Sequence, residues 1–276
     1  MSKQFLINGT FQKISPFDRA FQYGDGIFRT FIVENKKPRH WKYHYKKIVE
    51  DCRAIKITPP KEKALLSDIQ LLFKAKKRAV GKFIISRGVS ERGYKFNSTI
   101  THNRFLIKTK MPIYPMKFFK YGVDLHVCKQ KLNVSILSGI KHLNRLENIM
   151  ARQEWNDDRY IDGILLNQDG HVIECISSNI FMRIGKTIYT PKMNHVGIKG
   201  VTRELFIKIG IKLGFKIKEA VFGLDKLLKA DEVFITNSLF GVLQVKKIKK
   251  SLLPCRVTCY MLNIVETNNI KLVQSC

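Results

Sequence analysis

Two prolines, Pro112 and Pro115, stand close together near the middle of the chain, in the stretch MPIYPMKFFK of residues 111–120. Because proline lacks a backbone N–H and restricts the residue before it, this stretch disfavours a regular helix or strand. At about 150 residues per domain, the 276 residues suffice for two domains. We therefore predict a smaller N-terminal α/β domain over residues 1–110, a connection over 111–122 and a larger C-terminal domain over 123–276.

Apolar periodicity predicts strands and helices in the first domain. Ile27–Glu34 alternates and is rich in β-branched residues, which is typical of a strand. His40–Ile57 has helical periodicity, with Ile48, Cys52 and Ile55 on one face. The remaining predicted elements are a helix over Lys61–Lys77 and strands over Phe83–Arg87 and Arg104–Lys108.

The second domain is predicted to combine one prominent amphipathic helix with short strands. In SGIKHLNRLENIMARQEW, residues 138–155, we expect a helix over Lys141–Trp155. Its buried stripe is expected to be Leu143, Leu146, Ile149 and Met150. The other expected elements are strands over Val123–Cys128, Ile164–Leu166, His171–Cys175, Ile180–Ile184, Thr187–Tyr189, Glu232–Thr236 and Val242–Ile248, a helix from Gly200 to about Leu213, and a short helix after Pro254.

The formal charge of +28 bears on the kind of partner. Basic residues are spread along the whole chain, and there is no zinc finger, no basic region followed by heptads and no aromatic RNA-binding signature. We therefore expect a general lysine background that favours capture of an anionic small molecule, rather than a dedicated nucleic-acid partner.

Cysteine usage and hydropathy indicate the compartment. The six cysteines are scattered, and free thiols are the simplest interpretation. Cys255 and Cys259 could share a helix face, but no neighbouring pair completes a zinc site, so no metal is expected. No run of about 18 apolar residues indicates a membrane span, and the N-terminus lacks the apolar segment of a signal peptide. Together these features predict a cytoplasmic protein.

Four short stretches carry the residues with chemical meaning. They are DRAFQYGDGIF (18–28), KHLNRLE (141–147), VIECISSNIF (172–181) and GIKGVTRE (197–204). In this order and at these separations they resemble the fold-type IV pyridoxal-phosphate enzymes, which include branched-chain and D-amino-acid aminotransferases and aminodeoxychorismate lyases. The resemblance spans residues 5–245 and implies two α/β domains, a cofactor in the cleft between them, and a homodimer.

The resemblance implies a role for each stretch. Lys141 is the amine that binds the cofactor covalently and moves protons, and its place at a helix start would favour the neutral amine. Glu174 is the carboxylate that keeps the pyridine nitrogen protonated. The alternatives without the family are a surface lysine and an outward strand residue. Further implied cofactor contacts, including the backbone N–H groups at a helix start, are Ser177, Ser178, Asn179, Val201, Thr202 and Ser238.

One position departs from the family pattern. The family carries an arginine three residues after a histidine, where it binds the phosphate, but here Lys47 follows His44. Lysine keeps the charge and loses the planar two-pronged contact. We expect Lys47 to contact the phosphate, and the alternative is a solvated helix residue.

Three features favour the lyases over the aminotransferases. Arg145 lies in KHLNRLE, SRGVSERGY (86–94) resembles a lyase signature, and Arg29 replaces the usual aminotransferase glutamate. Aminodeoxychorismate carries two carboxylates, which arginine binds in a charge-assisted fork. We therefore expect Arg29 and Arg92 to bind substrate, with Tyr94 as a wall or hydrogen-bond donor. Their alternatives are a strand-surface arginine and a loop arginine.

The expected reaction converts 4-amino-4-deoxychorismate to 4-aminobenzoate and pyruvate, a step of folate biosynthesis. An aminotransferase acting on D-amino or branched-chain amino acids is the main alternative, because it would share every cofactor residue. A third possibility is a basic nucleic-acid-binding protein on an inactive enzyme scaffold, which rests on the charge alone.

Overall fold

The computed structural model describes residues 4–254 except 75–77, 98, 194 and 213. The chain groups into two units: unit 1 consists of Met1–Pro112 with Ile140–Arg145, and unit 2 of Ile113–Gly139 with Leu146–Cys276. The chain therefore passes from one unit to the other three times, which a single boundary near Pro112 does not anticipate. The domain limits stay a prediction, and the helix expected after Pro254, with Cys255 and Cys259, lies outside the described residues.

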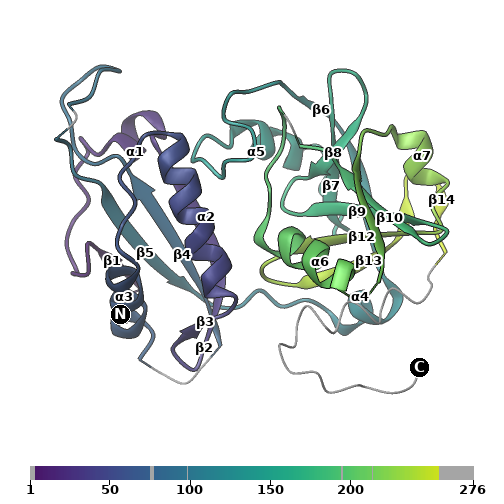
Figure 1. Cartoon of the computed structure of the whole chain (residues 1–276), viewed down its shortest axis with the longest axis horizontal. Coiled ribbons are helices and arrows are strands. Elements are labelled where there is room, and N and C mark those ends of the chain that lie inside the picture. The colour runs from purple at the N-terminus through teal and green to yellow at the C-terminus, as the bar shows by residue number, and fades with distance from the viewer. Residues whose placement is uncertain (1–3, 75–77, 98, 194, 213, 255–276) are drawn as a thin grey trace. The chain divides into compact units, whose positions relative to one another are not determined.

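An antiparallel sheet forms the centre of unit 1, with α2 (Trp41–Ala54) and α3 (Glu62–Leu72) on one face and the short α1 (Arg19–Tyr23) just before β2 (Figure 1). In spatial order its strands are β1 (Phe5–Ile7), β5 (Asn103–Thr109), β4 (Ala79–Ser86), β2 (Gly26–Glu34) and β3 (Lys37–Pro38). The strands and helices predicted for the N-terminal residues are confirmed, with helix ends displaced by a few residues.

Aromatic and β-branched side chains fill the space between these helices and the sheet. The rings of Phe31 on β2 and Phe83 on β4 stack with centroids 5.6 Å apart, and the Phe31 ring also lies 5.6 Å from that of His44 on α2. Ile48 and Cys52 are fully buried, as the helical periodicity predicted. Burying such an apolar side chain stabilises the fold by about 2 kcal/mol.

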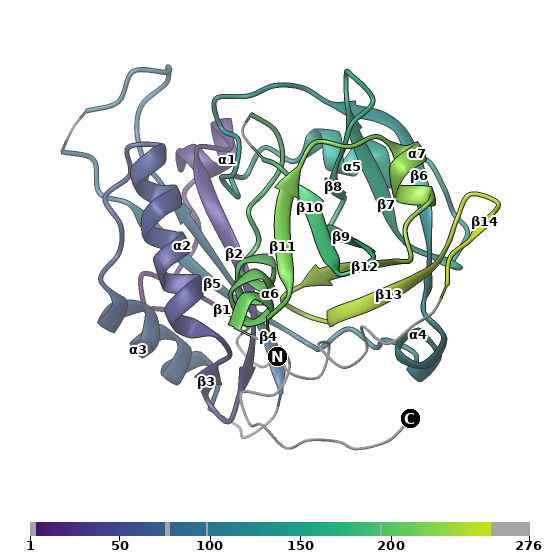
Figure 2. The ribbon, with the colours of Figure 1, turned by 45° about the vertical axis from the view of Figure 1, so that its right-hand side comes forward.

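Unit 2 is built on a mixed sheet (Figure 2). In spatial order its strands are β11 (Lys216–Ala220), β10 (Thr187–Pro191), β9 (Asn179–Ile184), β12 (Glu232–Asn237), β13 (Gly241–Ile248), β6 (Val123–Leu132), β7 (Tyr160–Asn167) and β8 (Val172–Cys175), and β14 (Ser251–Leu252) pairs with β13. Its helices are α4 (Met116–Tyr121), α5 (Leu146–Arg152), α6 (Val201–Lys212) and α7 (Leu224–Leu228). The predicted strands and the helix after Gly200 are confirmed.

Three phenylalanine rings fix α6 against the sheet of unit 2. Phe206 of α6 lies 4.8 Å from Phe181 on β9 and 4.9 Å from Phe234 on β12, measured between ring centroids. All three side chains are buried. The start of α6 is therefore held at a defined place beside β9.

The predicted helix over Lys141–Trp155 is wrong in its first five residues, in its last three residues and in its buried face. Helix α5 begins only at Leu146, because the backbone before it bonds to β2: Phe28 N–H donates to Lys141 O at 2.9 Å and Leu143 N–H to Gly26 O at 3.0 Å. Three of the four residues of the expected buried stripe are instead exposed, and Leu143 is half-buried. The exposed fractions of Leu146, Ile149 and Met150 are 70%, 56% and 55%.

The expected irregular connection over residues 111–122 also contains a helix. Helix α4 begins directly after Pro115, which serves as its N-cap residue. A proline before a helix removes no intrahelical hydrogen bond, so it interrupts only the residues that precede it. No helix in the described part of the chain is long and apolar enough to cross a membrane.

Candidate active site

The backbone of Lys141 is held from two sides in unit 1. Its carbonyl accepts a hydrogen bond from Phe28 N–H at 2.9 Å, and its N–H donates to Asp51 Oδ2 on α2 at 3.2 Å. Its Nζ lies 4.7 Å from the ring centroid of Phe28. Because Lys141 lies five residues before Leu146, the first residue of α5, it does not stand at a helix start, and that part of the sequence argument is wrong.

A buried ion pair contacts the backbone of Lys141. Arg29 Nη2 on β2 pairs closely with the same Asp51 Oδ2, and both side chains are buried. Burial, followed by the charges of Arg29, His40 and Lys141, lowers the pKa of His44 to about 3. The His44 ring is therefore neutral at pH 7. The substrate-binding role of Arg29 stays a prediction, and within unit 1 the guanidinium already has a carboxylate partner.

Lys47 lies on α2, and its side chain is only 11% exposed. Its Nζ is 2.9 Å from Glu50 Oε2, and Lys46 pairs with the same carboxylate at 3.4 Å. Burial alone would raise the pKa of Glu50, but the hydrogen bonds and charges of Lys47 and Lys46 together outweigh it and lower that pKa. A phosphate would have to compete with Glu50 for this amine, so the phosphate contact stays a prediction.

Arg92 and Tyr94 lie on the loop between β4 and β5, and both are exposed. The Tyr94 side chain is 87% exposed, with its ring centroid 5.7 Å from that of Tyr23 on α1. Arg145, by contrast, donates from Nε to His142 O at 2.9 Å and from Nη2 to Ile140 O at 3.0 Å. Arg145 thus binds the backbone carbonyls of the two residues that flank Lys141.

In unit 2, two predicted side chains converge on the turn that precedes α6. Glu174 on β8 is buried, and its Oε2 accepts from Ile198 N–H at 2.9 Å. Asn179 on β9 donates from Nδ2 to Ile198 O at 2.8 Å and accepts at Oδ1 from Gly200 N–H at 3.2 Å. The structure therefore brings Glu174 and Asn179 together at residues 198–200.

The first residues of α6 form a candidate anion-binding site. Val201 and Thr202 open a helix of 12 residues and are buried. The N–H groups of a helix's first turn have no intrahelical acceptor and attract negative charge. A Cβ at Gly200 would collide with Asn179 Oδ1, so the approach of Asn179 to this turn requires glycine there.

The serines before β9 have a different partner from the one expected. Ser177 Oγ and Ser178 Oγ donate to Asp162 Oδ2 on β7 at 2.8 and 2.7 Å. A phosphate only accepts hydrogen bonds, so these hydroxyls have no proton left for it in this arrangement. Direct contact of either serine with a cofactor stays a prediction.

Ser238 lies in the turn between β12 and β13. The preceding Asn237 fixes that turn, because its Oδ1 accepts from the N–H groups of Leu239 and Phe240 at 2.9 and 3.0 Å. Asn237 Nδ2 also donates to Ser177 O at 3.5 Å. Ser238 directly follows the residue that makes this contact, and its own phosphate contact stays a prediction.

Two buried carboxylates of the site, Asp51 and Asp162, were not identified from the sequence. Asp51 stands on the apolar face of α2, three residues after Ile48, and Asp162 interrupts the apolar strand β7. A charged residue within an apolar face is rarely buried without a partner. The pattern could therefore have marked both residues, although not their partners.

The chain belongs to the class IV aminotransferase family: the family model "Amino-transferase class IV" matches residues 26–248. With its two mixed α/β units, the structure has the fold of this family.

Individual relatives are more specific. The chain is 32% identical over 247 residues to an aminodeoxychorismate lyase of Vibrio harveyi, and the matched region covers 88% of this chain and 91% of the lyase. It is 28% identical over 254 residues to an aminodeoxychorismate lyase of Bacillus subtilis, covering 88% and 86%. The crystal structure of 4-amino-4-deoxychorismate lyase from Pseudomonas aeruginosa matches with a TM-score of 0.88 at 31% identity, covering 94% and 97%.

Proposed function

We propose that this chain is a pyridoxal-phosphate-dependent carbon–oxygen lyase that converts 4-amino-4-deoxychorismate to 4-aminobenzoate and pyruvate, and so supplies folate biosynthesis. The observation that carries the proposal is the arrangement before α6, where Glu174 and Asn179 bind the same turn at an anion-attracting helix start. Similarity to aminodeoxychorismate lyases over most of the chain supports the choice of reaction.

The residues present fit the cofactor. Its phosphate requires N–H donors, which Val201 and Thr202 offer at the start of α6. Its pyridine nitrogen requires a carboxylate, which Glu174 offers from a buried position. Its aldehyde requires an amine on a fixed backbone, which Lys141 offers in unit 1. When bound, the cofactor draws electrons away from the substrate carbon that carries the amine.

Lys141 is the proposed proton carrier. Its amine takes the proton from C4 of the substrate as a general base and can return a proton to the departing enolpyruvyl group. Glu174 holds the proton on the pyridine nitrogen. Arg92 binds a substrate carboxylate in a two-pronged contact, with Tyr94 beside it. Lys47 and Ser238 are the proposed additional phosphate contacts.

The proposed reaction balances without a further reactant. The C4–H bond and the ether C–O bond break, the ring becomes 4-aminobenzoate, and the three-carbon fragment takes up a proton and leaves as pyruvate. Since the new aromatic ring supplies much of the driving force, the protein's part is to position groups and place charge.

The test is to incubate the cofactor-loaded protein with 4-amino-4-deoxychorismate and measure both products. We expect 4-aminobenzoate and pyruvate in equal amounts, and loss of both with Lys141→Ala, together with the visible absorption band of the cofactor. Rapid turnover of D-alanine or leucine with 2-oxoglutarate, without aminobenzoate formation, would identify an aminotransferase instead. Absence of the absorption band from protein exposed to the cofactor would reject the whole proposal.

We also propose that the enzyme is a cytoplasmic homodimer. The apolar side chains of Leu146, Ile149 and Met150 on α5 are exposed, which leaves a surface for a second copy to cover. Light scattering should give twice the chain mass. A Leu146→Glu/Ile149→Glu variant should give the monomer, whereas Lys212→Glu on α6 should not change the mass.

A further inference from the structure

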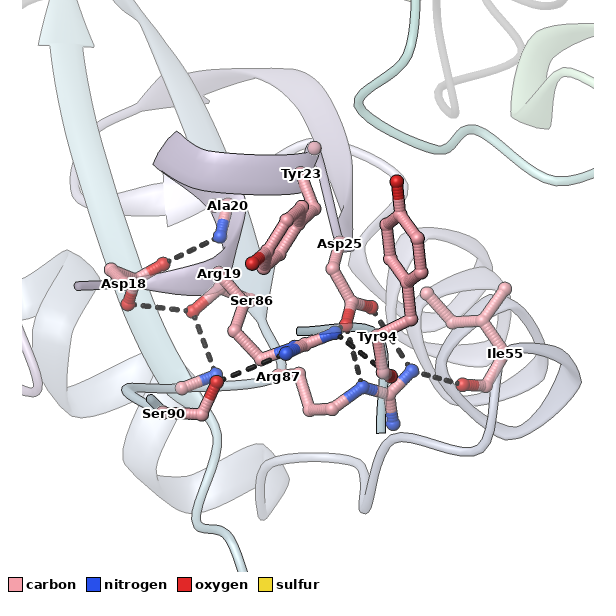
Figure 3. A network of polar contacts seen from close by, with 12 residues as sticks. Asp18, Arg19, Ala20, Tyr23, Asp25, Ile55, Ser86, Arg87, Ser90 and Tyr94 are labelled. Atoms are coloured by element: carbon pink, nitrogen blue, oxygen red, sulfur yellow. Dashed lines mark hydrogen bonds and ion pairs between the residues drawn. The ribbon is translucent and has the colours of Figure 1, made fainter. Parts of the chain in front are cut away.

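A single buried arginine in unit 1 binds the loop of residues 88–94 at several points (Figure 3). Arg19 Nη1 donates to Ser90 Oγ at 3.0 Å and to Gly93 O at 2.9 Å, and Nη2 to Tyr94 O at 3.4 Å. The backbone N–H of Arg19 also donates to Gly88 O at 2.9 Å. Three of these acceptors are main-chain carbonyls, so Arg19 fixes the path of the loop rather than one side chain.

The loop itself is shaped to accept these contacts. Gly88 and Gly93 both have φ +115°, a backbone conformation that glycine adopts without strain. Gly93 N–H donates to the hydroxyl of Tyr23 at 2.9 Å, so both polar backbone groups of Gly93 are bound by α1 residues. Arg92 lies directly before this fixed point, and Tyr94 directly after it.

Asp25 pairs both with Arg19 and with a second arginine, Arg87, which binds a different segment. Asp25 Oδ2 accepts from Arg19 Nε at 2.8 Å and from Arg87 Nε at 2.7 Å. Arg87 extends to the carbonyls of Ile55 and Lys56, at 2.7 and 2.8 Å, and so holds the end of α2. Asp25 therefore orients two arginines, of which only Arg19 hydrogen-bonds to the 88–94 loop.

We propose that Arg19 is the positioning residue that holds Arg92 and Tyr94 where they receive the substrate's carboxylate. This inference rests on the proposed function for the identity of the substrate, but the anchoring itself does not depend on it. An exposed loop that flanks a substrate-binding arginine must be ordered before binding, or the substrate bears the cost of ordering it. Arg19 orders the loop in the free protein.

The anchoring is tested by proteolysis of the protein without substrate. Trypsin cuts after Arg92. Arg19→Lys keeps the charge beside Asp25 but cannot bind all three loop acceptors of the guanidinium, so it should speed that cut about tenfold. Arg87→Lys is the matched control and should leave the rate unchanged. The cut after Lys95 is not compared, because Arg87 lies 3.8 Å from the centroid of the Phe96 ring, so the control Arg87→Lys would itself disturb that bond. Equal rates after Arg92 in both variants would overturn the proposal.

The link to the substrate is tested by kinetics. Arg19→Lys should raise the KM for 4-amino-4-deoxychorismate about tenfold, with kcat and cofactor affinity close to those of the parent protein. Tyr23→Phe, which removes only the hydroxyl bound by Gly93 N–H, provides a milder variant and should raise KM about threefold. An unchanged KM in a variant that trypsin cuts faster would overturn the positioning role. If no protein form converts this substrate, the proposed function fails, and the proteolysis result still decides the anchoring.

Discussion

Unit 1 and unit 2 hold their candidate functional residues by different kinds of interaction. In unit 1, arginine–carboxylate pairs do so: Arg29 with Asp51 next to Lys141, and Arg19 with Asp25 next to the 88–94 loop. In unit 2, the amide of Asn179 holds the turn before α6, and Asp162 accepts from hydroxyl and backbone N–H groups. Removal of Asp51 leaves a buried charge unpaired, whereas removal of Asn179 leaves neutral backbone groups unpaired, and the former costs more.

The largest effect is expected for Asp51→Ala. It leaves Arg29 buried without its counter-ion and removes the acceptor of Lys141 N–H, so the free energy of unfolding should fall by about 3–5 kcal/mol in urea denaturation. The double variant Arg29→Met/Asp51→Leu removes both charges and should recover most of this loss. Its cofactor absorption should remain altered, because Lys141 N–H still lacks its acceptor. A loss below about 1 kcal/mol in the single variant would contradict the comparison.

His44 in unit 1 and Asp162 in unit 2 should contribute to the pH dependence of stability in opposite directions. The pKa of His44 falls from 6.5 to about 3 on folding, so below pH 6.5 the unfolded chain binds a proton that the folded chain does not. Stability from this group is complete above pH 6.5 and falls by about 2–3 kcal/mol between pH 7 and pH 4.5. Burial raises the pKa of Asp162 above its ordinary value of 3.8, although its hydrogen bonds oppose this. The contribution of Asp162 to stability therefore falls as the pH rises from 3.8 through its folded-state pKa.

Urea unfolding of the parent protein and of His44→Phe, at intervals from pH 7 to pH 4.5, checks this prediction. The variant should lose less stability on acidification, because it removes the His44 ring, whose pKa is lowered on folding. A stability difference between the two proteins that stays constant over this pH range would show that His44 does not titrate as expected.

A smaller effect is expected for Asn179→Ala in unit 2. It leaves Ile198 O and Gly200 N–H without their partner, which should cost about 1–3 kcal/mol and weaken cofactor binding about tenfold in an absorbance titration. Asn167→Ala is the matched control, since Asn167 Oδ1 also holds a turn by accepting from His171 N–H at 2.8 Å, away from α6. The control should lose stability without a change in cofactor affinity.

The smallest effect is expected for Ser177→Ala. Asp162 keeps the Ser178 hydroxyl and the N–H of Gly163, at 2.7 and 2.9 Å, so stability should fall by only about 1 kcal/mol. Cofactor affinity should be nearly unchanged, because the lost hydroxyl donates to Asp162. A tenfold weaker affinity would instead support the direct cofactor contact that the sequence motif predicted.

Local patterns explain which parts of the fold could be predicted. The alternation of residues 27–34 and the apolar face of residues 40–57 directly determine which side chains are buried, so β2 and α2 were predictable. Residues 141–145 also had helical spacing, but β2, more than a hundred residues earlier, takes their backbone hydrogen bonds. Such a distant partner overrides local propensity and leaves no periodic signal.

The candidate site likewise contains residues that the sequence could identify and pairings that it could not. Motif positions such as Glu174 and Asn179 could be named from the sequence, since their types and spacing are characteristic. What Asp162 does for the serines, or Asp25 for two arginines, depends on pairings between separate strands and loops. Those pairings follow from the fold and not from spacing along the chain.

The return of residues 140–145 to unit 1 sets an order for synthesis on the ribosome. Residues 1–112 emerge first, but Gly26 O and Phe28 N–H then lack the partners that Leu143 and Lys141 later provide. Unit 1 is thus completed only after more than thirty further residues have been translated, and Lys141 belongs to the last segment to join it. A fragment ending at Pro112 would expose that part of β2, and an unpaired strand edge invites association between chains.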